Sequence, residues 1–262
     1  MNSVVDISWL TLLVFFSLLT IPMLVSRIYQ LDMNKEIILS VTRMTVQLLL
    51  VGVYLEFLFD LNSLLVNLIW LTLMTLIGAS TIISKAKLPK SKLMFSVVSG
   101  LAIGLFPILT IITLFVVQPS PTYNAQYLIP LAGMLLGNSM SGNIVALQNF
   151  FNSLDERKGE YEAAIALGAS KEYATIPFVQ SAIKRSLAPT LATMTTSGLV
   201  TLPGMMTGQI LGGASPLVAI KYQILIMVAI FVMMSISITV ALKLTINNLI
   251  NKEGRVLIKP LA

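Results

Sequence analysis

The sequence predicts an all-α, polytopic integral membrane protein with about seven transmembrane helices and one short cytoplasmic helix. Two observations carry this prediction. Of the 262 residues, 56% are hydrophobic and only 11% are charged, whereas soluble domains carry about 25% charged residues. Apolar runs near 20 residues, long enough to cross ~30 Å of hydrocarbon as helices, also recur along the chain. We therefore treat residues 1–262 as a single transmembrane domain.

Seven apolar runs are the predicted spans, in order: Trp9 to Val25, Ile37 to Phe57, Leu64 to Ile83, Leu93 to Val117, Tyr127 to Phe150, Leu187 to about Met206, and Leu217 to Leu242. The fifth and sixth contain many small and hydroxyl residues, so their ends are less sharply defined. No cleavable signal peptide is expected, because the N-terminus lacks a basic region and Arg27 follows the first run.

The basic residues alternate between the segments that connect these runs. Fifteen of the 17 fall in four segments: Arg27 and Lys35; Lys85, Lys87, Lys90 and Lys92; Arg157, Lys158, Lys171, Lys184 and Arg185; and Lys243, Lys252, Arg255 and Lys259. The positive-inside rule then predicts a multi-pass protein of the plasma or inner membrane, N-terminus outside and C-terminus cytoplasmic. The net charge of +6 is explained by these loops next to lipid, so no nucleic-acid partner is expected.

Absent residue types limit the chemistry. With no Cys there are no disulfides or thiolate metal sites, and with no His the commonest transition-metal ligand and neutral-pH proton relay are missing. No segment fits the phosphate-binding pattern G-x4-G-K-[ST], so the chain is not expected to bind ATP or any other cofactor itself.

One connection differs from the others, the cytoplasmic loop at about 152–186. Its residues from Glu160 to about Ala174 have a helical pattern that Pro177 is expected to end. Two interpretations are open. The helix lies passively on the membrane surface, or it occupies a groove on a partner protein. The small residues Ala163 and Ala164 favour docking on a partner, and so does the scarcity of Lys and Arg in this segment.

The segment Glu162-Ala163-Ala164-x3-Gly168 resembles the EAA motif of ABC transporter permeases. That resemblance implies a coupling helix that docks on a separate ATPase subunit. The downstream part of the motif is kept only in part, because Ile176-Pro177 lies closer to the glycine than in the family pattern.

A second resemblance covers nearly the whole chain. Its motifs are Arg43-x3-Gln47-Leu48, Gly137-Asn138-Ser139-Met140, Ala166-Leu167-Gly168-Ala169-Ser170 and the stretch from Leu202 to Leu211, LPGMMTGQIL. These are similar to the FetB-type permeases, membrane subunits of a proposed bacterial iron exporter that are related to plant aluminium-tolerance proteins. The resemblance implies a non-enzymatic pathway subunit, a homodimer working with two copies of a cognate ABC ATPase that holds ATP and Mg²⁺, and a role in metal export and ion homeostasis.

Polar residues inside spans are candidates for the transport pathway, because they are costly in a bilayer. Arg43 lies about two turns into the second span, with Gln47 one turn further on the same face. Arg43 either contacts substrate or snorkels to the inner interface. Glu56 and Asp60, one turn apart at the outer end, either attract a cation at the mouth or simply end the helix at the headgroups.

The fifth span carries Asn138 beside the small residues Gly133, Gly137 and Ser141, a pattern typical of close helix packing. Asn138 itself either hydrogen-bonds across helices or lines the pathway. In the sixth span, Gly204, Gly208 and Gly212 repeat the small-residue pattern.

Pro203 predicts a break in the sixth span, a feature that often marks transport sites. Beside it, Met205 and Met206 are either soft thioether ligands or packing residues. Alternatively, hard oxygen ligands for a metal ion would come from Thr207, Gln209 and Asn138. No ligand cluster in the sequence identifies the metal.

Three alternatives stay open. The cargo is an organic or nucleotide-sugar solute with Arg43 as its anion contact, the chain is a secondary transporter driven by an ion gradient, or it is a membrane scaffold that transports nothing. The acidic residues lie at span ends or in loops, which disfavours ion coupling through a carboxylate. Motifs of this kind do not define the direction of transport.

Overall fold

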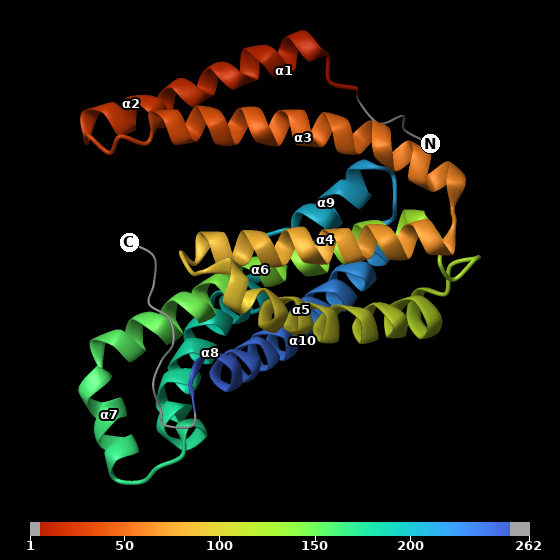
Figure 1. The fold of residues 1–262 in the computed structure, drawn as a ribbon. Helices are drawn as coiled ribbons and strands as arrows, with labels where there is room; N and C mark the ends of the chain where they lie inside the picture. The colour runs from red at the N-terminus through yellow and green to blue at the C-terminus, as the bar shows by residue number, and fades with distance from the viewer. Residues whose placement is uncertain (1–5, 252–262) are drawn as a thin grey trace.

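The computed structural model describes residues 6–251, and the regular elements in that range are helices (Figure 1). The predicted cytoplasmic charges Lys252, Arg255 and Lys259 lie outside the described residues. In chain order the elements are α1 (Trp9–Phe15), the 3₁₀ turn η1 (Phe16–Leu19), α2 (Thr20–Ile28), α3 (Asn34–Leu61), α4 (Leu64–Lys85), α5 (Lys90–Ile111), the π-helical η2 (Ile112–Val117), α6 (Ala125–Glu156), α7 (Lys158–Ala166), α8 (Lys171–Thr196), α9 (Gly204–Leu211) and α10 (Pro216–Leu249).

Within residues 6–251, six helical stretches are long and apolar enough to cross a membrane: Trp9–Ile28, Asn34–Leu61, Leu64–Lys85, Lys90–Val117, Ala125–Glu156 and Pro216–Leu249. They coincide with the first five predicted spans and the seventh, three of them extended at both ends and three at one end. The all-α, polytopic fold class is therefore confirmed. The 3₁₀ turn in the first span precedes Pro22, which has no N–H to bond Leu18 and so interrupts the helical ladder.

The predicted sixth span, Leu187 to Met206, is wrong as a single helix. The chain leaves the helical conformation at Ser197, makes an isolated bridge between Ser197 and Thr201, and resumes as α9 at Gly204. Pro203 is the extended N-cap residue of α9, so the break predicted at this proline is confirmed. Proline favours the start of a helix because its missing N–H is not needed there.

Pro177 does not end the cytoplasmic helix, so that prediction is also wrong. The loop contains α7, a turn at Gly168, and then α8, which continues through both Pro177 and Pro189. Ala174, Phe178 and Ala182 are buried along α8. Burial of this face holds the helix together across the missing hydrogen bonds, so tertiary packing overrides a local helix breaker.

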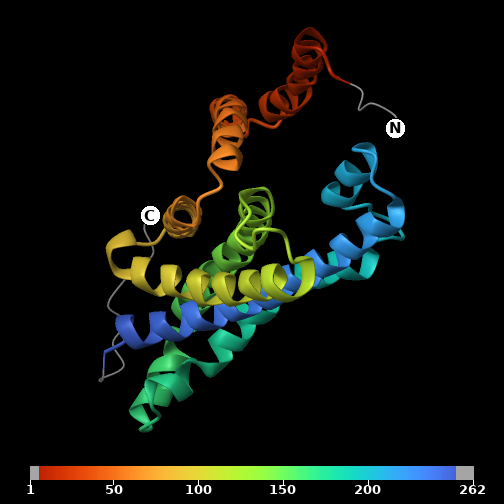
Figure 2. The ribbon, with the colours of Figure 1, turned by 90° about the vertical axis from the view of Figure 1, so that its right-hand side faces the viewer.

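Helix α10 is the centre of the bundle and packs on α5, α6, α8 and α9 (Figures 1 and 2). Helix α8 runs antiparallel to it: Lys171, at the start of α8, contacts the end of α10, whereas Thr190 contacts Met234 in the middle of α10. The α8 segment therefore returns along the bundle from the α7 end to the end where α9 lies (Figure 2). A further passage along the bundle is therefore made by α8 (Lys171–Thr196), which shares only its last residues with the predicted span Leu187 to Met206.

Glycines of α5 allow its close approach to α10. A Cβ added at Gly100 would lie 2.6 Å from the Ser237 carbonyl oxygen, and one at Gly104 would lie 3.0 Å from the Met233 oxygen. The small residues that the sequence emphasised do not pack in this way. Among residues 6–251, no heavy atom of another element lies within 4 Å of a Cβ built at Gly137, Gly204 or Gly208.

The N-terminal hairpin of α1–α3 lies apart from this bundle (Figure 2). Only Ser26 and Leu58 are buried in these helices within the described chain. The attachment is at the end of α3, where Leu58 packs with Ala125 and Ile129 of α6. An apolar helix with so little cover within its own chain must face lipid or another protein chain.

Candidate functional site

A helix end with a left-handed glycine lies where the sequence predicted the docking segment. The Gly168 N–H donates to the Ile165 carbonyl at 2.9 Å and the Ala169 N–H to the Ala164 carbonyl at 3.0 Å, with Gly168 at φ +90°. These two bonds form a Schellman motif, in which a left-handed residue satisfies the last carbonyls of a helix. Gly168 thus ends α7 in a sharp turn, and we call this segment, residues 167–170, the α7–α8 turn.

Helix α8 begins directly after this turn. The Ser170 hydroxyl accepts a hydrogen bond from the Tyr173 N–H at 3.2 Å and so caps the new helix. The predicted single helix from Glu160 to Ala174 is therefore two helices joined at Gly168. The turn permitted by Gly168 is confirmed, and its cause is the left-handed conformation that glycine adopts without steric cost.

Aromatic contacts anchor α7 on α8. The buried rings of Tyr161 and Phe178 meet edge to face at 6.4 Å, and the Arg157 guanidinium lies 5.0 Å from the centroid of Phe178. Burial raises the pKa of the Tyr161 hydroxyl above its ordinary value, and the nearby Glu172 adds to the shift. These contacts fix α7 against α8, so the turn between them is held at a defined place relative to α8.

An ion pair between Arg157 and Glu160 closes the first turn of α7. The hydrogen bond from Arg157 lowers the pKa of the Glu160 carboxyl and raises that of the guanidinium. Because the pKa of the carboxyl is lower in the folded state, the ion pair stabilises the fold at pH values above the ordinary pKa. This stabilisation is lost as the pH falls through the lowered pKa. Both groups are exposed, so this pair contributes little to stability.

The α7–α8 turn and the first turn of α8 present apolar side chains outward. Leu167 is 90% exposed and Tyr173 is 70% exposed, although both belong to the polar loop and not to a predicted span. In the motif itself, Glu162 and Ala163 are exposed and Ala164 is half-buried. Glu162 forms only an exposed ion pair with Lys158 at 3.5 Å. Exposed apolar groups at a helix junction favour contact with another protein.

The polar residues predicted on the second span all lie on the exposed surface of α3. Arg43, Gln47, Glu56 and Asp60 are exposed, and none makes a hydrogen bond or ion pair within the described residues. The structure therefore does not join them to the bundle within one chain. Their predicted roles as pathway and outer-mouth residues stay predictions.

Asn138 lies on the face of α6 that is turned away from the core of the bundle. It is exposed, and its Nδ2 donates to the Met134 carbonyl of its own helix at 2.8 Å. Gly137 and Ser141, its neighbours on this face, are exposed as well. At 1.5 Å per residue, Asn138 lies about 20 Å from the start of α6, near the middle of a span. The structure thus places an amide and two small residues on a face of α6 that the described chain leaves uncovered, close to the middle of the helix.

Sequence reasoning missed the buried polar contact on the opposite face of α6. The hydroxyls of Ser139 and Ser237 are 2.9 Å apart, and the Asn143 Nδ2 donates to both, at 3.1 and 2.8 Å. These residues join α6 to α10 at the centre of the bundle. Because the groups satisfy one another, this cluster holds helices together and is not a vacant site.

The structure leaves one buried acceptor atom on α9 and one on α10 without a partner within the described residues. The Oε1 atoms of Gln209 and Gln223 are buried and make no hydrogen bond within the described chain. Gln223 is only 8% exposed and lies on α10, against which α9 packs. Gln209 was predicted, but Gln223 was not, although an amide in the apolar run that begins α10 is a readable signal.

The other predicted α9 residues are half-buried. Met205 packs against the core cluster, and the Thr207 hydroxyl donates to the Pro203 carbonyl at 3.2 Å. Met205 therefore has the packing role that was one of its two interpretations. The side chain of Met206 is half-buried too, and metal binding by either thioether stays a prediction. The described residues contain no group of three or more His, Cys, Asp or Glu arranged for a metal.

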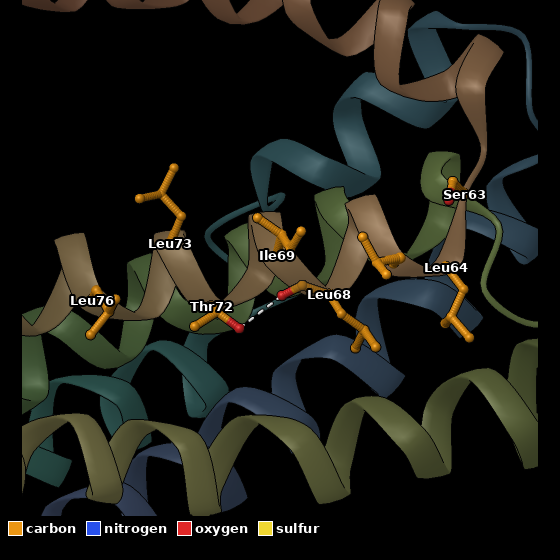
Figure 3. Close-up of a pocket in the computed structure, with 8 residues that line it drawn as sticks. Ser63, Leu64, Leu68, Ile69, Thr72, Leu73 and Leu76 are labelled. Carbon is orange, nitrogen blue, oxygen red and sulfur yellow. Dashed lines mark hydrogen bonds between the residues drawn. The ribbon is translucent and has the colours of Figure 1, made fainter.

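One cavity in the described part of the chain lies away from these polar groups. It is a groove of about 790 Å³ along one face of α4, lined mainly by leucine and isoleucine from Leu64 to Leu76 (Figure 3). Its Thr72 hydroxyl already donates to the Leu68 carbonyl at 2.8 Å. A second, polar cavity of about 400 Å³ lies at the α2–α3 connection, between Ser26 and Lys35. The α4 groove suits hydrocarbon or an apolar helix, because leucine and isoleucine make up most of its lining.

Comparison with known proteins gives a consistent result. Residues 9–250 match the family model described as "Uncharacterised protein family (UPF0014)". The chain is 33% identical over 230 residues to a UPF0014 membrane protein of Synechocystis, covering 86% of this chain and 87% of that protein. It is 36% identical over 200 residues to Protein ALUMINUM SENSITIVE 3 of Arabidopsis thaliana, covering 75% and 71%.

A further relative carries a functional name. The chain is 28% identical over 248 residues, 93% of each protein, to the "Probable iron export permease protein FetB" of Escherichia coli. The resemblance drawn from the PGMMTGQIL stretch and the other motifs is therefore confirmed. No solved structure matches the chain.

Proposed function

We propose, from the premise that this chain belongs to the UPF0014 family of membrane proteins, that it is the membrane permease subunit of an ATP-driven metal exporter. A separate ABC ATPase would bind and hydrolyse ATP, and this chain would form the pathway. The observation that carries the proposal is the α7–α8 turn. It is held between two helices, lies outside the predicted spans and exposes an apolar side chain at Leu167. Similarity to a protein named as an iron export permease supports the cargo.

The α7–α8 turn has the properties of a docking element. It is held in place by the buried Tyr161 and Phe178, and Gly168 gives it one defined backbone conformation. Leu167 is nearly fully exposed at its tip. An apolar side chain presented on a pre-organised turn binds a partner without an ordering cost. This supports the partner interpretation of residues 162–168 over a passive surface helix.

The uncovered polar face of α6 supports a homodimer. An amide facing lipid is unfavourable, because hydrocarbon offers its polar atoms no partner. Asn138 is exposed at mid-span beside Gly137 and Ser141, whose small side chains permit close approach of another helix. A second copy of the chain, or a water-filled pathway between two copies, would cover this face.

Gly137→Phe is therefore expected to convert a dimer to a monomer in detergent. The chain itself can accommodate the ring, since nothing lies within 4 Å of a Cβ built there. Gly52→Phe is the matched control, because Gly52 on α3 is equally open and is not on the proposed interface. Size-exclusion chromatography with light scattering measures the mass. A Gly137→Phe protein that stays dimeric would contradict this interface.

The unpaired acceptors favour a cationic cargo over an anionic one. Gln209 and Gln223 each keep a buried oxygen without a donor, and an oxygen of this kind binds a cation or the water bound to it. A nucleotide sugar would need donors and positive charge in their place, with Arg43 as its contact. Arg43 lies exposed on α3 and makes no bond to α9 or α10.

Ion-gradient coupling is less well supported. Every Asp and Glu within residues 6–251 is exposed in the chain, so none has the buried position from which a carboxylate exchanges protons or sodium inside a membrane. The exposed turn at Leu167 also has no role in a transporter of that kind. The ATP-driven mechanism explains both observations.

The test of function is the metal content of iron-loaded cells that express this chain together with its ATPase. The wild-type pair is expected to lower cellular iron, and Leu167→Asp is expected to abolish the effect, because charging one central apolar contact typically costs ~2 kcal/mol or more of binding. Gly159→Asp is the control: it adds the same charge to α7 where nothing lies within 4 Å. A higher iron content in cells with the wild-type pair would mean that the transporter imports iron.

Unchanged iron, manganese, copper and zinc, with the ATPase still bound, would exclude metal as the cargo. Equal effects of Leu167→Asp and Gly159→Asp would show that the α7–α8 turn is not the docking element.

A further inference from the structure

The first residue of α8 is attached to the last turn of α10. The Lys171 Nζ donates to the Ile250 carbonyl at 2.9 Å and to the Asn247 carbonyl at 3.2 Å. Lys171 is half-buried and follows the α7–α8 turn directly. The two residues it reaches are 76 and 79 positions away in the chain.

This contact satisfies a specific need of a helix end. The last four carbonyls of a helix have no N–H partner within the helix, and the helix dipole places partial negative charge there. A lysine ammonium has three donors and a full positive charge. Lys171 therefore acts as a cap supplied by one helix to another, and the end of α10 cannot separate from the start of α8 without losing it.

The same end of α10 is linked onward to α5. The Asn248 Nδ2 donates to the Ser96 hydroxyl at 3.3 Å, and one turn further along α5 the backbones meet at Gly100. Close backbone packing transmits displacement, since tightly packed interiors do not deform continuously. A shift at the end of α10 is therefore passed to α5.

Two further hydrogen bonds join α6 to its neighbouring helices. The Arg185 Nη1 donates to the Asn149 Oδ1 at 2.9 Å, joining α8 to α6, and the Gln148 Nε2 donates to the Lys85 carbonyl at 3.0 Å, joining α6 to the end of α4. Helix α8 thus has two cationic attachments. Arg185 fixes its middle to α6, and Lys171 fixes its start to α10.

We propose that Lys171 is the positioning residue that carries displacement of the α7–α8 turn to α10. The inference rests on the proposed function for the origin of that displacement, which is the ATPase docked on the turn. Movement of the turn would pull the Lys171 ammonium, and through the carbonyls of Asn247 and Ile250 it would move the central helix of the bundle.

Lys184 provides the matched comparison. It lies on the same helix, is exposed, and makes no hydrogen bond or ion pair within the described residues. It therefore makes no contact that could join α8 to α10. Lys171→Met and Lys184→Met remove the same charge and keep a similar side-chain length, so a difference between them measures the contact with α10.

The first measurement is amide hydrogen exchange on the purified chain without its ATPase. Lys171→Met is expected to speed exchange in the last turn of α10 by about fivefold, the effect of losing ~1 kcal/mol at a helix end, whereas Lys184→Met leaves it unchanged. Lys171→Arg is expected to restore protection, because arginine also donates to carbonyls. Equal exchange in Lys171→Met and Lys184→Met would overturn the attachment itself.

The second measurement is transport per ATP hydrolysed by the reconstituted pair. Lys171→Met is expected to keep the ATPase bound and hydrolysing while transport per ATP falls, and Lys171→Arg is expected to recover it. A normal ratio in a transporting pair, despite faster exchange at α10, would overturn the transmission role and leave the proposed function intact. If the wild-type chain bound no ATPase, the proposed function would fail and the transmission role would fail with it, whatever the exchange result.

Discussion

Gly100→Ala is expected to destabilise the folded chain strongly, because the added methyl group would collide with backbone atoms of α10. The new Cβ would lie 2.6 Å from the Ser237 carbonyl oxygen and 3.1 Å from the Ala241 nitrogen, and both are backbone atoms of α10. A flexible side chain could move aside, but the backbone of the central helix cannot do so without moving the helix. Overpacking of this kind costs about 1–3 kcal/mol, and more where backbone must shift.

The loss extends beyond the contact itself. Ser237 also bonds Ser139 and Asn143 of α6 through its hydroxyl, so a displaced α10 leaves buried polar groups partly unpaired. Each such group costs about 1–3 kcal/mol. Since folded domains are stable by only about 5–15 kcal/mol, most of the purified Gly100→Ala protein is expected to aggregate or unfold well below the wild-type temperature.

Gly78→Ala is the control for this prediction. Gly78 is also a buried glycine within a span, on α4, but its added Cβ would lie 3.7 Å from the Met140 sulfur and 3.8 Å from Leu101, ordinary contact distances. Thermal unfolding in detergent, followed by circular dichroism and by the monodisperse fraction, compares the two. Equal midpoints for Gly100→Ala and Gly78→Ala would refute the close approach of α5 and α10.

Gly168→Val is expected to release the ATPase while leaving the membrane bundle folded. At φ +90° a β-branched residue is strongly disfavoured, with a local cost of roughly 1–2 kcal/mol. The α7–α8 turn would open, the Schellman hydrogen bonds would be lost, and Leu167 would leave its position. The bundle is unaffected, because nothing lies within 4 Å of a Cβ built at Gly168.

Gly168→Asn separates conformation from the side chain. Asparagine adopts the left-handed region more readily than other non-glycine residues, so this variant is expected to keep the turn and to bind the ATPase close to the wild-type level. Affinity co-purification with the ATPase and the thermal midpoint of the chain are measured together. Loss of binding in both variants would mean that the added volume, and not the turn conformation, is decisive.

Individual residues explain which sequence predictions succeeded. Pro203 and Gly168 were recognisable because each acts on its own backbone, by a missing N–H in one case and a left-handed conformation in the other. Pro177 has the same local tendency, yet α8 continues through it, because the buried side chains on either side of it decide the outcome. A local signal therefore predicts structure only where no tertiary contact opposes it.

The residues of the candidate site also divide into those that local sequence signals reveal and those that only tertiary contacts reveal. The EAA-type segment was found from the types and spacing of residues 162–168, and Gln209 from its place beside a break in a span. Asn138 was equally visible, but nothing in its neighbourhood along the chain reveals that it faces outward from α6. Gln223 became a candidate only because its oxygen is buried without a donor.

The sequence by itself determined the class of this protein, six of its membrane-crossing helices and its family, because hydrocarbon imposes a local requirement. Each span must supply its own ~20 apolar residues and satisfy its own backbone. Only the tertiary structure decided which face of each helix is covered, that α8 is one continuous helix, and that Lys171 caps α10. Those features depend on pairs such as Gly100 with Ser237 and Lys171 with Ile250, whose members are far apart in the chain and meet only after the helices pack.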